Sequence, residues 1–268
     1  MIRREIQLAG LDRQWLLISQ VEHARISAVL AQRCLGQFGR STDTDTHVLR
    51  AVRKELISAI VHHDDGWEPW EVQPQLDAEH GRPLSFRELP LEVSLPIWSA
   101  SVEAAAEVGP LAAWMVSGHF LALLLASDKP PGPQAAQWQR RIVAERMIWL
   151  ANWQAINLEN HTRRLADEAL LWLQLFDVTS LWLCSACPGH GEQIIQTPEN
   201  YRFGAGKQLE TQLDFEQDRV RFRPWRLDVP EIQIDVAGSL VPIREYGSAA
   251  ELDAARIAHS LHWQLTGE

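Results

Sequence analysis

The chain has 268 residues, a formal net charge of −10 and a hydrophobic content of 46%, including 12 tryptophans. This length and apolar content support a substantial buried core, so the fold needs no disulfide framework. The negative charge argues against non-specific binding to nucleic acid or attraction to anionic membranes, and we expect neither partner.

The first third of the chain predicts short strands followed by two helices. Residues 1–18 contain one or two strands, of which residues 15–18 are the clearest. Ser19 is a suitable N-cap for a helix that reaches about residue 37. Residues 46–61 predict the second helix, because one face repeats apolar residues at spacings of three and four: Leu49, Val52, Leu56 and Ile60.

The middle of the chain combines a long irregular segment with strongly helical patterns. Residues 66–96 are rich in proline, glycine, tryptophan and acids, which predicts either a substrate-covering loop or an irregular surface connection. Residues 96–127 predict helix, with a break near Gly109-Pro110. After the prolines at 130–133, helical patterns run to about residue 184 and end in a stretch that is apolar almost all round.

The last third predicts a change to β structure. Apolar and polar residues alternate over residues 220–223, 232–236 and 240–243, as in half-buried strands. Residues 248–265 predict a closing helix with Ser248 as its N-cap.

Cysteine usage and hydropathy point to one compartment. Three cysteines, an odd number, are typical of the reducing cytosol. The first residues lack the apolar stretch of a signal peptide. The most apolar segment, residues 111–126, is shorter than a membrane span and predicts a buried helix. We therefore expect a cytoplasmic protein.

A His-Asp doublet interrupts the apolar pattern of the second helix. Continuing the buried face of residues 46–61 by the same step places His63 and Asp64 facing inward. Burying such groups costs several kcal/mol unless they are hydrogen-bonded, paired or bound to a metal. Three more ionisable residues fall on apolar helical faces, namely His23, His119 and Asp177. Imidazoles and carboxylates suit Mn, Fe, Zn and related divalent ions, so the sequence predicts a metal site.

The order of a histidine, a His-Asp doublet and a distant aspartate resembles the HD metal-dependent phosphohydrolase superfamily, which has an all-helical fold. The resemblance implies one metal held by His23, His63, Asp64 and Asp177. His119 lies where two-metal members carry additional histidines, which implies a second metal or stabilisation of charge on the phosphoryl oxygens.

Over nearly its whole length the chain also resembles an uncharacterised bacterial family, domain of unknown function 3891. The matching features are Gln20-x-x-His23-Ala24, His62-His63-Asp64-Asp65-Gly66-Trp67, Ser117-Gly118-His119-Phe120 and Asp177-Val178-Thr179-Ser180-Leu181. This second resemblance implies no established activity.

Residues around the doublet are candidates for catalysis and substrate binding. The catalytic candidates are His119, Asp65 and His62, of which the last two flank the doublet and could orient a ligand or hold a water. The substrate-binding candidates are Gln20 and Gln174, each one turn before an expected ligand, and Trp67 at the start of the long segment. Alternatively, the two glutamines and the flanking residues His62 and Asp65 have no such role and are simply polar residues on partly exposed helices. No phosphate-binding glycine loop or dinucleotide fingerprint is present, so no organic cofactor is expected.

We therefore expect a mainly α protein, with an HD-like helical bundle over residues 1–190 (core about 11–184) and a small α+β region over residues 191–268 packed on it. The leading function is hydrolysis of a small phosphate ester or nucleotide with one or two divalent ions, Mn, Fe, Zn or Mg. The negative net charge does not exclude a phosphorylated substrate, because a bound metal ion can outweigh the negative field of the whole protein at its site. Oxygenation at a di-iron centre, and a non-catalytic binding or regulatory role with a degenerate site, are the alternatives.

Overall fold

The structure is a computed structural model that describes residues 1–8, 10–34, 49–126, 130–186, 212–216, 218–223 and 227–267. The chain divides into two compact units. Unit 1 comprises Met1–Ile26, Glu68–Leu89 and Val178–Glu268, and unit 2 comprises Ser27–Trp67 and Pro90–Asp177. Two of the divisions fall inside helices α1 (Gln20–Cys34) and α8 (Arg163–Ser185). The expected boundary between residues 190 and 191 lies outside the described residues.

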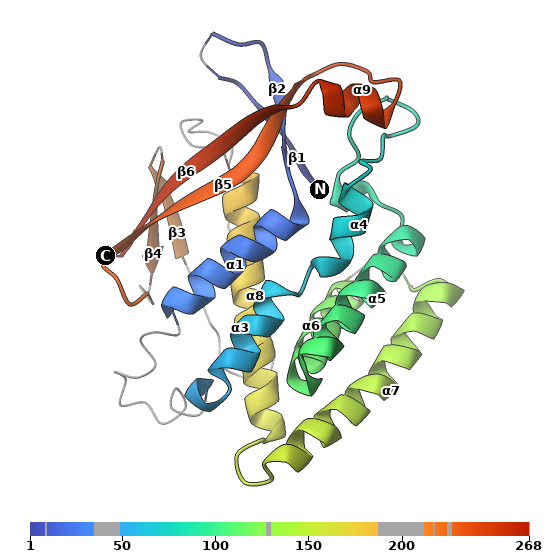
Figure 1. Cartoon of the computed structure of the whole chain (residues 1–268), viewed down its shortest axis with the longest axis vertical. Helices are drawn as coiled ribbons and strands as arrows, with labels where there is room; N and C mark the ends of the chain where they lie inside the picture. The colour runs from blue at the N-terminus through green and yellow to red at the C-terminus, as the bar shows by residue number, and fades with distance from the viewer. Residues whose placement is uncertain are drawn as a thin grey trace. The chain divides into compact units, whose positions relative to one another are not determined.

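Unit 1 is built on a six-stranded sheet with the order β1-β2-β5-β6-β4-β3. All neighbours are antiparallel except β4 and β6, which are parallel. Figure 1 shows β5 and β6 as the two long strands of this sheet. The strands are β1 (Ile2–Ile6), β2 (Gln14–Ile18), β3 (Gln212–Glu216), β4 (Arg219–Arg223), β5 (Glu231–Pro242) and β6 (Ile257–Gly267).

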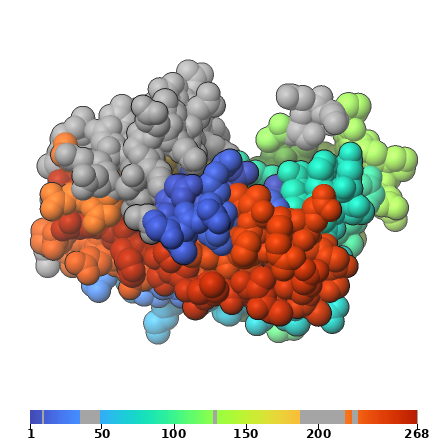
Figure 2. All heavy atoms as spheres, turned by 90° about the horizontal axis from the view of Figure 1, so that it is seen from above, coloured from blue at the N-terminus to red at the C-terminus, as the bar shows by residue number. Residues whose placement is uncertain are grey.

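This sheet shows that the expected mainly α, HD-like bundle is wrong. The strands predicted within residues 1–18 are confirmed, but they join the C-terminal strands in one sheet, since Gln14 of β2 pairs with Pro242 of β5. Figure 2 shows the consequence, with the blue N-terminal residues lying among the orange and red C-terminal ones. The β structure is therefore not a small C-terminal addition to a helical bundle.

The closing helix expected over residues 248–265 is also wrong. Only α9 (Ala249–Ala254) is helical there, with the Ser248 side chain accepting a hydrogen bond from the Glu251 N–H as predicted for an N-cap. Residues Ile257–Gly267 instead form β6, in which Leu261, Trp263 and Leu265 alternate with less buried positions. This period of two fits a strand that has β5 beside it along most of its length.

The segment expected to be irregular over residues 66–96 contains several short helical elements. It contains η2 (Asp65–Trp67), α4 (Glu68–Glu71), η3 (Phe86–Glu88) and the start of α5 (Leu91–Val108). Trp70 and Leu76 of this segment pack on an apolar cluster of unit 1 that includes Trp15, Leu17 and Tyr246.

Unit 2 is helical and is organised around α6 (Pro110–Leu125). The predicted break before this helix is confirmed, because Gly109 has φ 154° and Pro110 begins the next helix. Every residue from Leu111 to Phe120 is buried, and α3 (Arg53–Val61), α5 and α7 (Pro133–Ile156) pack against this helix. None of the helices that the structure describes combines the length and apolar character needed to cross a membrane.

Gly238→Ala tests the pairing of the N-terminal strands with β5. A Cβ at this position would come within 2.8 Å of the Leu17 carbonyl oxygen and 3.1 Å of Ile18 Cγ1. We expect the substitution to lower the free energy of unfolding by about 2 kcal/mol, because β5 must move away from β2. At Gly247, a Cβ would meet only Glu251 Oε2, at 3.4 Å, so Gly247→Ala is the matched control. Equal unfolding midpoints in urea for the two variants would contradict the strand pairing.

Candidate metal centre

The His-Asp doublet lies in the turn that joins α3 to η2, and not on the helix itself as its periodicity suggested. The helix ends at Val61. The His62 N–H donates the last backbone hydrogen bond of the helix, to the Ser58 carbonyl oxygen at 3.1 Å. His63 Nδ1 lies 2.7 Å from the Ile60 carbonyl oxygen, one of the acceptors left free where a helix stops. The His63 side chain thus helps to end the helix that carries it.

Gly66 holds this turn against α5. Its N–H donates to Ser101 Oγ at 3.0 Å. A Cβ on Gly66 would lie 2.1 Å from the Ile97 carbonyl oxygen and 2.7 Å from the Ser101 backbone nitrogen, so only glycine allows this approach. The position of η2 against α5 fixes the direction in which the preceding doublet points.

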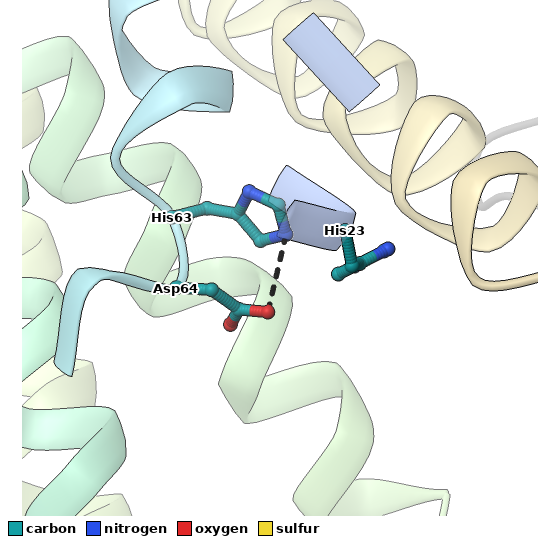
Figure 3. A group of neighbouring side chains, drawn as sticks. All are labelled: His23, His63 and Asp64. Carbon is teal, nitrogen blue, oxygen red and sulfur yellow. Dashed lines mark ion pairs between the residues drawn. The ribbon is translucent and has the colours of Figure 1, made fainter. Parts of the chain in front are cut away.

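Four side chains of unit 2 converge in a buried cluster. His63 Nε2 lies 3.3 Å from Asp177 Oδ1 and 3.7 Å from Asp64 Oδ2. His119 Nε2 lies 3.9 Å from the same Asp177 oxygen, and the two imidazole rings meet edge to face with centroids 5.8 Å apart. None of the four side chains is more than 7% exposed. Figure 3 shows the Asp64 carboxylate directed at the His63 ring.

The surroundings of His63 determine its protonation. Because Nδ1 faces a carbonyl oxygen, it carries a hydrogen, and Nε2 is the atom presented to the two carboxylates. Burial lowers the pKa of His63, but the charge of Asp64 together with the hydrogen bond and charge of Asp177 outweighs this effect and raises the pKa to about 9. In the absence of a cation, His63 therefore holds a second proton at neutral pH.

His23 on α1 is fully buried, and its Nδ1 lies 2.6 Å from Ser180 Oγ. Of the residues expected as ligands, His63, Asp64 and Asp177 are thus brought together within unit 2, whereas His23 belongs to unit 1. His119, expected beside them, also contacts Asp177.

The donor set fits a divalent ion of the Mn, Fe or Zn type. Neutral imidazole nitrogens and carboxylate oxygens are the ligands that these ions share. The contact of His63 Nδ1 with a backbone carbonyl is the outer contact that metal-binding histidines use to fix ring orientation. The cluster therefore has both the donors and the supporting contact that a metal site needs.

The flanking candidates lie elsewhere. His62 Nδ1 is 2.7 Å from Asp65 Oδ2, and these side chains are 41% and 37% exposed, so the two residues pair with each other at the surface. Their catalytic role stays a prediction. The three residues expected to bind substrate are differently placed: Gln20 and Trp67 are buried, and Gln174 is half-buried. Gln20 Oε1 is buried with no hydrogen-bond partner among the described residues.

Sequence reasoning missed the supporting residues of the cluster. Gly66 and Ser180 lie inside the motifs that carry the family resemblance, but nothing in the sequence assigned them a role. Ser101 had no signal at all, because its contact with Gly66 joins residues 35 positions apart.

Together, the sheet of unit 1 and the helices of unit 2 define an α+β protein with a buried His–Asp cluster. The chain matches the model of the family described as "Protein of unknown function (DUF3891)" over residues 1–243, and it belongs to that family. This confirms the resemblance to domain of unknown function 3891, whereas the comparisons give no support to the HD resemblance. No curated protein and no solved structure matches the chain.

Gly66→Ala is expected to disrupt the turn that carries the doublet. The new methyl group would overlap backbone atoms of α5, so we expect a loss of about 3 kcal/mol in the free energy of unfolding. Gly132→Ala is the control, because a Cβ there meets nothing within 4 Å and the loss of a glycine N-cap costs at most about 1 kcal/mol. Chemical denaturation measures both. A Gly66→Ala protein as stable as the control would exclude close packing of η2 on α5.

Metal-free protein should become less stable as the pH rises toward 9. The pKa of His63 is raised to about 9 in the folded chain from 6.5, so its protonated form contributes stability that is complete below pH 6.5 and is lost as the pH passes through about 9. The effect is on the order of 3 kcal/mol. Denaturation in the presence of a chelator, at several pH values, should show this loss in the wild type and not in His63→Gln. Parallel pH profiles for the two proteins would rule out the raised pKa.

Proposed function

We propose that this protein is a metal-dependent hydrolase of small phosphate esters or nucleotides. Its ion would be held by the Asp64 and Asp177 carboxylates and the His63 and His119 imidazoles. The observation that carries this proposal is the approach of His63 Nε2 to two buried carboxylates, at 3.3 and 3.7 Å.

Charge balance supports a divalent ion in this cluster. Two buried carboxylates face the same histidine nitrogen, and buried charges are destabilising unless they are paired. A divalent cation bound by neutral imidazoles balances both carboxylates. The donors therefore match the ion in charge as well as in chemical type.

The chemistry that a divalent ion supplies in such a site is acidification of a bound water toward neutral pH, which makes it a nucleophile for hydrolysis. A phosphate ester suits the site because its anionic oxygens are attracted to the same cation, so a chain with a net charge of −10 needs no basic surface to bind it. The His62–Asp65 pair, next to the doublet and partly exposed, would exchange protons with solvent and pass one to the leaving group.

A second candidate is a purely structural His–Asp network. It is favoured by the closure of the cluster, since its side chains are at most 7% exposed. In that case the proton on His63, with its pKa near 9, would take the place of the ion. The two candidates differ in a single measurable property, which is metal content.

We expect elemental analysis of protein purified without added metal to find a divalent ion in stoichiometric amount. His63→Ala/Asp64→Ala should abolish it, because two ligands are lost. His62→Ala/Asp65→Ala removes the same residue types from the same turn but should retain the metal, since these side chains contact each other and not the cluster. Hydrolysis of generic phosphate esters should disappear in the first variant and fall in the second by about a hundredfold.

Three outcomes would count against the proposal. Absence of metal, even after incubation with divalent ions, would establish the structural network. Bound metal without hydrolysis of any phosphate ester would keep the metal centre and reject the hydrolase. Bound iron with consumption of oxygen would favour an oxygenase.

A further inference from the structure

Arg146 of α7 is a buried cation that has no anionic partner. Its side chain is 8% exposed, and it forms no ion pair with any residue that the structure describes. Its hydrogen-bond acceptors are two uncharged oxygens of α6, the Trp114 carbonyl oxygen and Ser117 Oγ, and both are bonded by Nη1. A buried charge normally has a partner of opposite charge, because its desolvation otherwise costs several kcal/mol. Arg146 lacks such a partner within its own chain as described.

Helix α6 holds the guanidinium group in one position. Cζ of Arg146 lies 3.6 Å from the centroid of the Trp114 ring, which is a cation–π contact. A Cβ on Gly118 would lie 2.2 Å from Arg146 Nη1 and 2.7 Å from Leu170 Cδ2, so the glycine makes room for the guanidinium between α6 and α8. The planar group is therefore fixed before any ligand binds, as in preorganised binding sites.

Only one of the three guanidinium nitrogens is used in these contacts. Nε and Nη2 donate no hydrogen bond to a described residue. The buried side-chain nitrogens without a partner include Trp114 Nε1 but neither of these two atoms, so Nε and Nη2 are accessible to solvent. Together they present two parallel N–H groups, the arrangement that binds two oxygens of a carboxylate or a phosphate.

The surroundings of Arg146 are positively charged, although the chain as a whole carries −10. Arg163 of α8 lies over the same Trp114 ring, with its Cζ 4.6 Å from the ring centroid. Asp167 is hydrogen-bonded to Arg163, from Nε at 2.9 Å. Burial, followed by the charge of Arg163, lowers the pKa of Arg146 to about 10 and outweighs the opposite effect of Asp167. A bound anion would offset both of the effects that lower this pKa.

We propose that the Nε–Nη2 edge of Arg146 is a binding site for a small oxyanion, either a phosphate or a carboxylate group. Two charge-assisted hydrogen bonds would hold the anion, and Arg163 would add a second positive charge nearby. None of the described contacts of Arg146 involves a residue of the metal centre. The inference is therefore independent of the proposed hydrolase activity.

Isothermal titration calorimetry of the full chain tests this site, with inorganic phosphate and acetate as separate probes in a buffer that contains no other oxyanion. We expect one anion to bind per chain, and the probe that binds more tightly identifies the chemical group that the site takes. Arg146→Met should weaken binding by more than about thirtyfold, because both charge-assisted hydrogen bonds are lost. Arg140→Met is the matched control, since Arg140 is an exposed arginine of the same helix, and it should bind as the wild type does.

Two further variants decide the result if Arg146→Met does not fold. Arg146→Lys keeps the positive charge but not the paired N–H groups, so it should weaken binding by about tenfold. His63→Ala/Asp64→Ala should retain binding, because the anion does not contact the metal centre. Absence of saturable binding of either anion, or equal affinities of the wild type and the Arg146 variants, would overturn the proposal. Loss of binding in His63→Ala/Asp64→Ala would also overturn it and would place the anion at the metal centre.

Discussion

Two carboxylates buried beside one histidine impose the main constraint on unit 2. Asp64 and Asp177 are almost inaccessible to water, and each needs a partner of positive charge. His63 is placed to be that partner for both, since its Nε2 faces the two carboxylates while its Nδ1 is held by the end of α3. His63 and Asp177 are 114 positions apart, so their contact also requires α8 to lie against the turn that follows α3.

The surrounding helices hold this arrangement in place. The buried helix α6 supplies His119 from a stretch in which every side chain is enclosed, so its ring has little freedom to turn away. The doublet itself sits on a turn, but the turn is restrained at both ends, by the helix-ending contact of His63 and by the close approach of Gly66 to α5. Sites whose side chains are fixed in this way need little rearrangement to bind an ion or to stabilise a charge.

Much of the helical part could be predicted from the sequence because periodicity is a local property. The apolar positions Leu56 and Ile60 mark the buried side of α3, and Gly109-Pro110 marks the break before α6. The out-of-place polar residues His63, Asp64, His119 and Asp177 pointed to the cluster for the same reason: each occupies a position that the pattern reserves for an apolar side chain. Periodicity did not show that α3 stops at Val61, because the contacts that hold the following turn, such as that of Gly66 with Ser101 of α5, join residues far apart in the sequence.

The sheet was harder to predict because strand pairing is not local. Leu261, Trp263 and Leu265 are buried at every second position, as in a strand. The same residues follow the helix N-cap Ser248, however, and this cap favoured the prediction of a helix. What decides between the two is β5, which pairs with β6 over ten positions. In the same way, nothing near β2 indicates that its neighbour is β5.

The pairing of β2 with β5 also has a consequence for the order of folding. During synthesis, β1 and β2 emerge first and can form a hairpin, but one edge of β2 stays open until β5 follows more than two hundred residues later. The segments of unit 2 lie entirely before residue 178, so all of them are available earlier. Contacts this distant in sequence slow folding and leave a strand edge able to pair with other chains in the meantime. Among the elements that the structure describes, the sheet of unit 1 is therefore completed later in synthesis than the helices of unit 2.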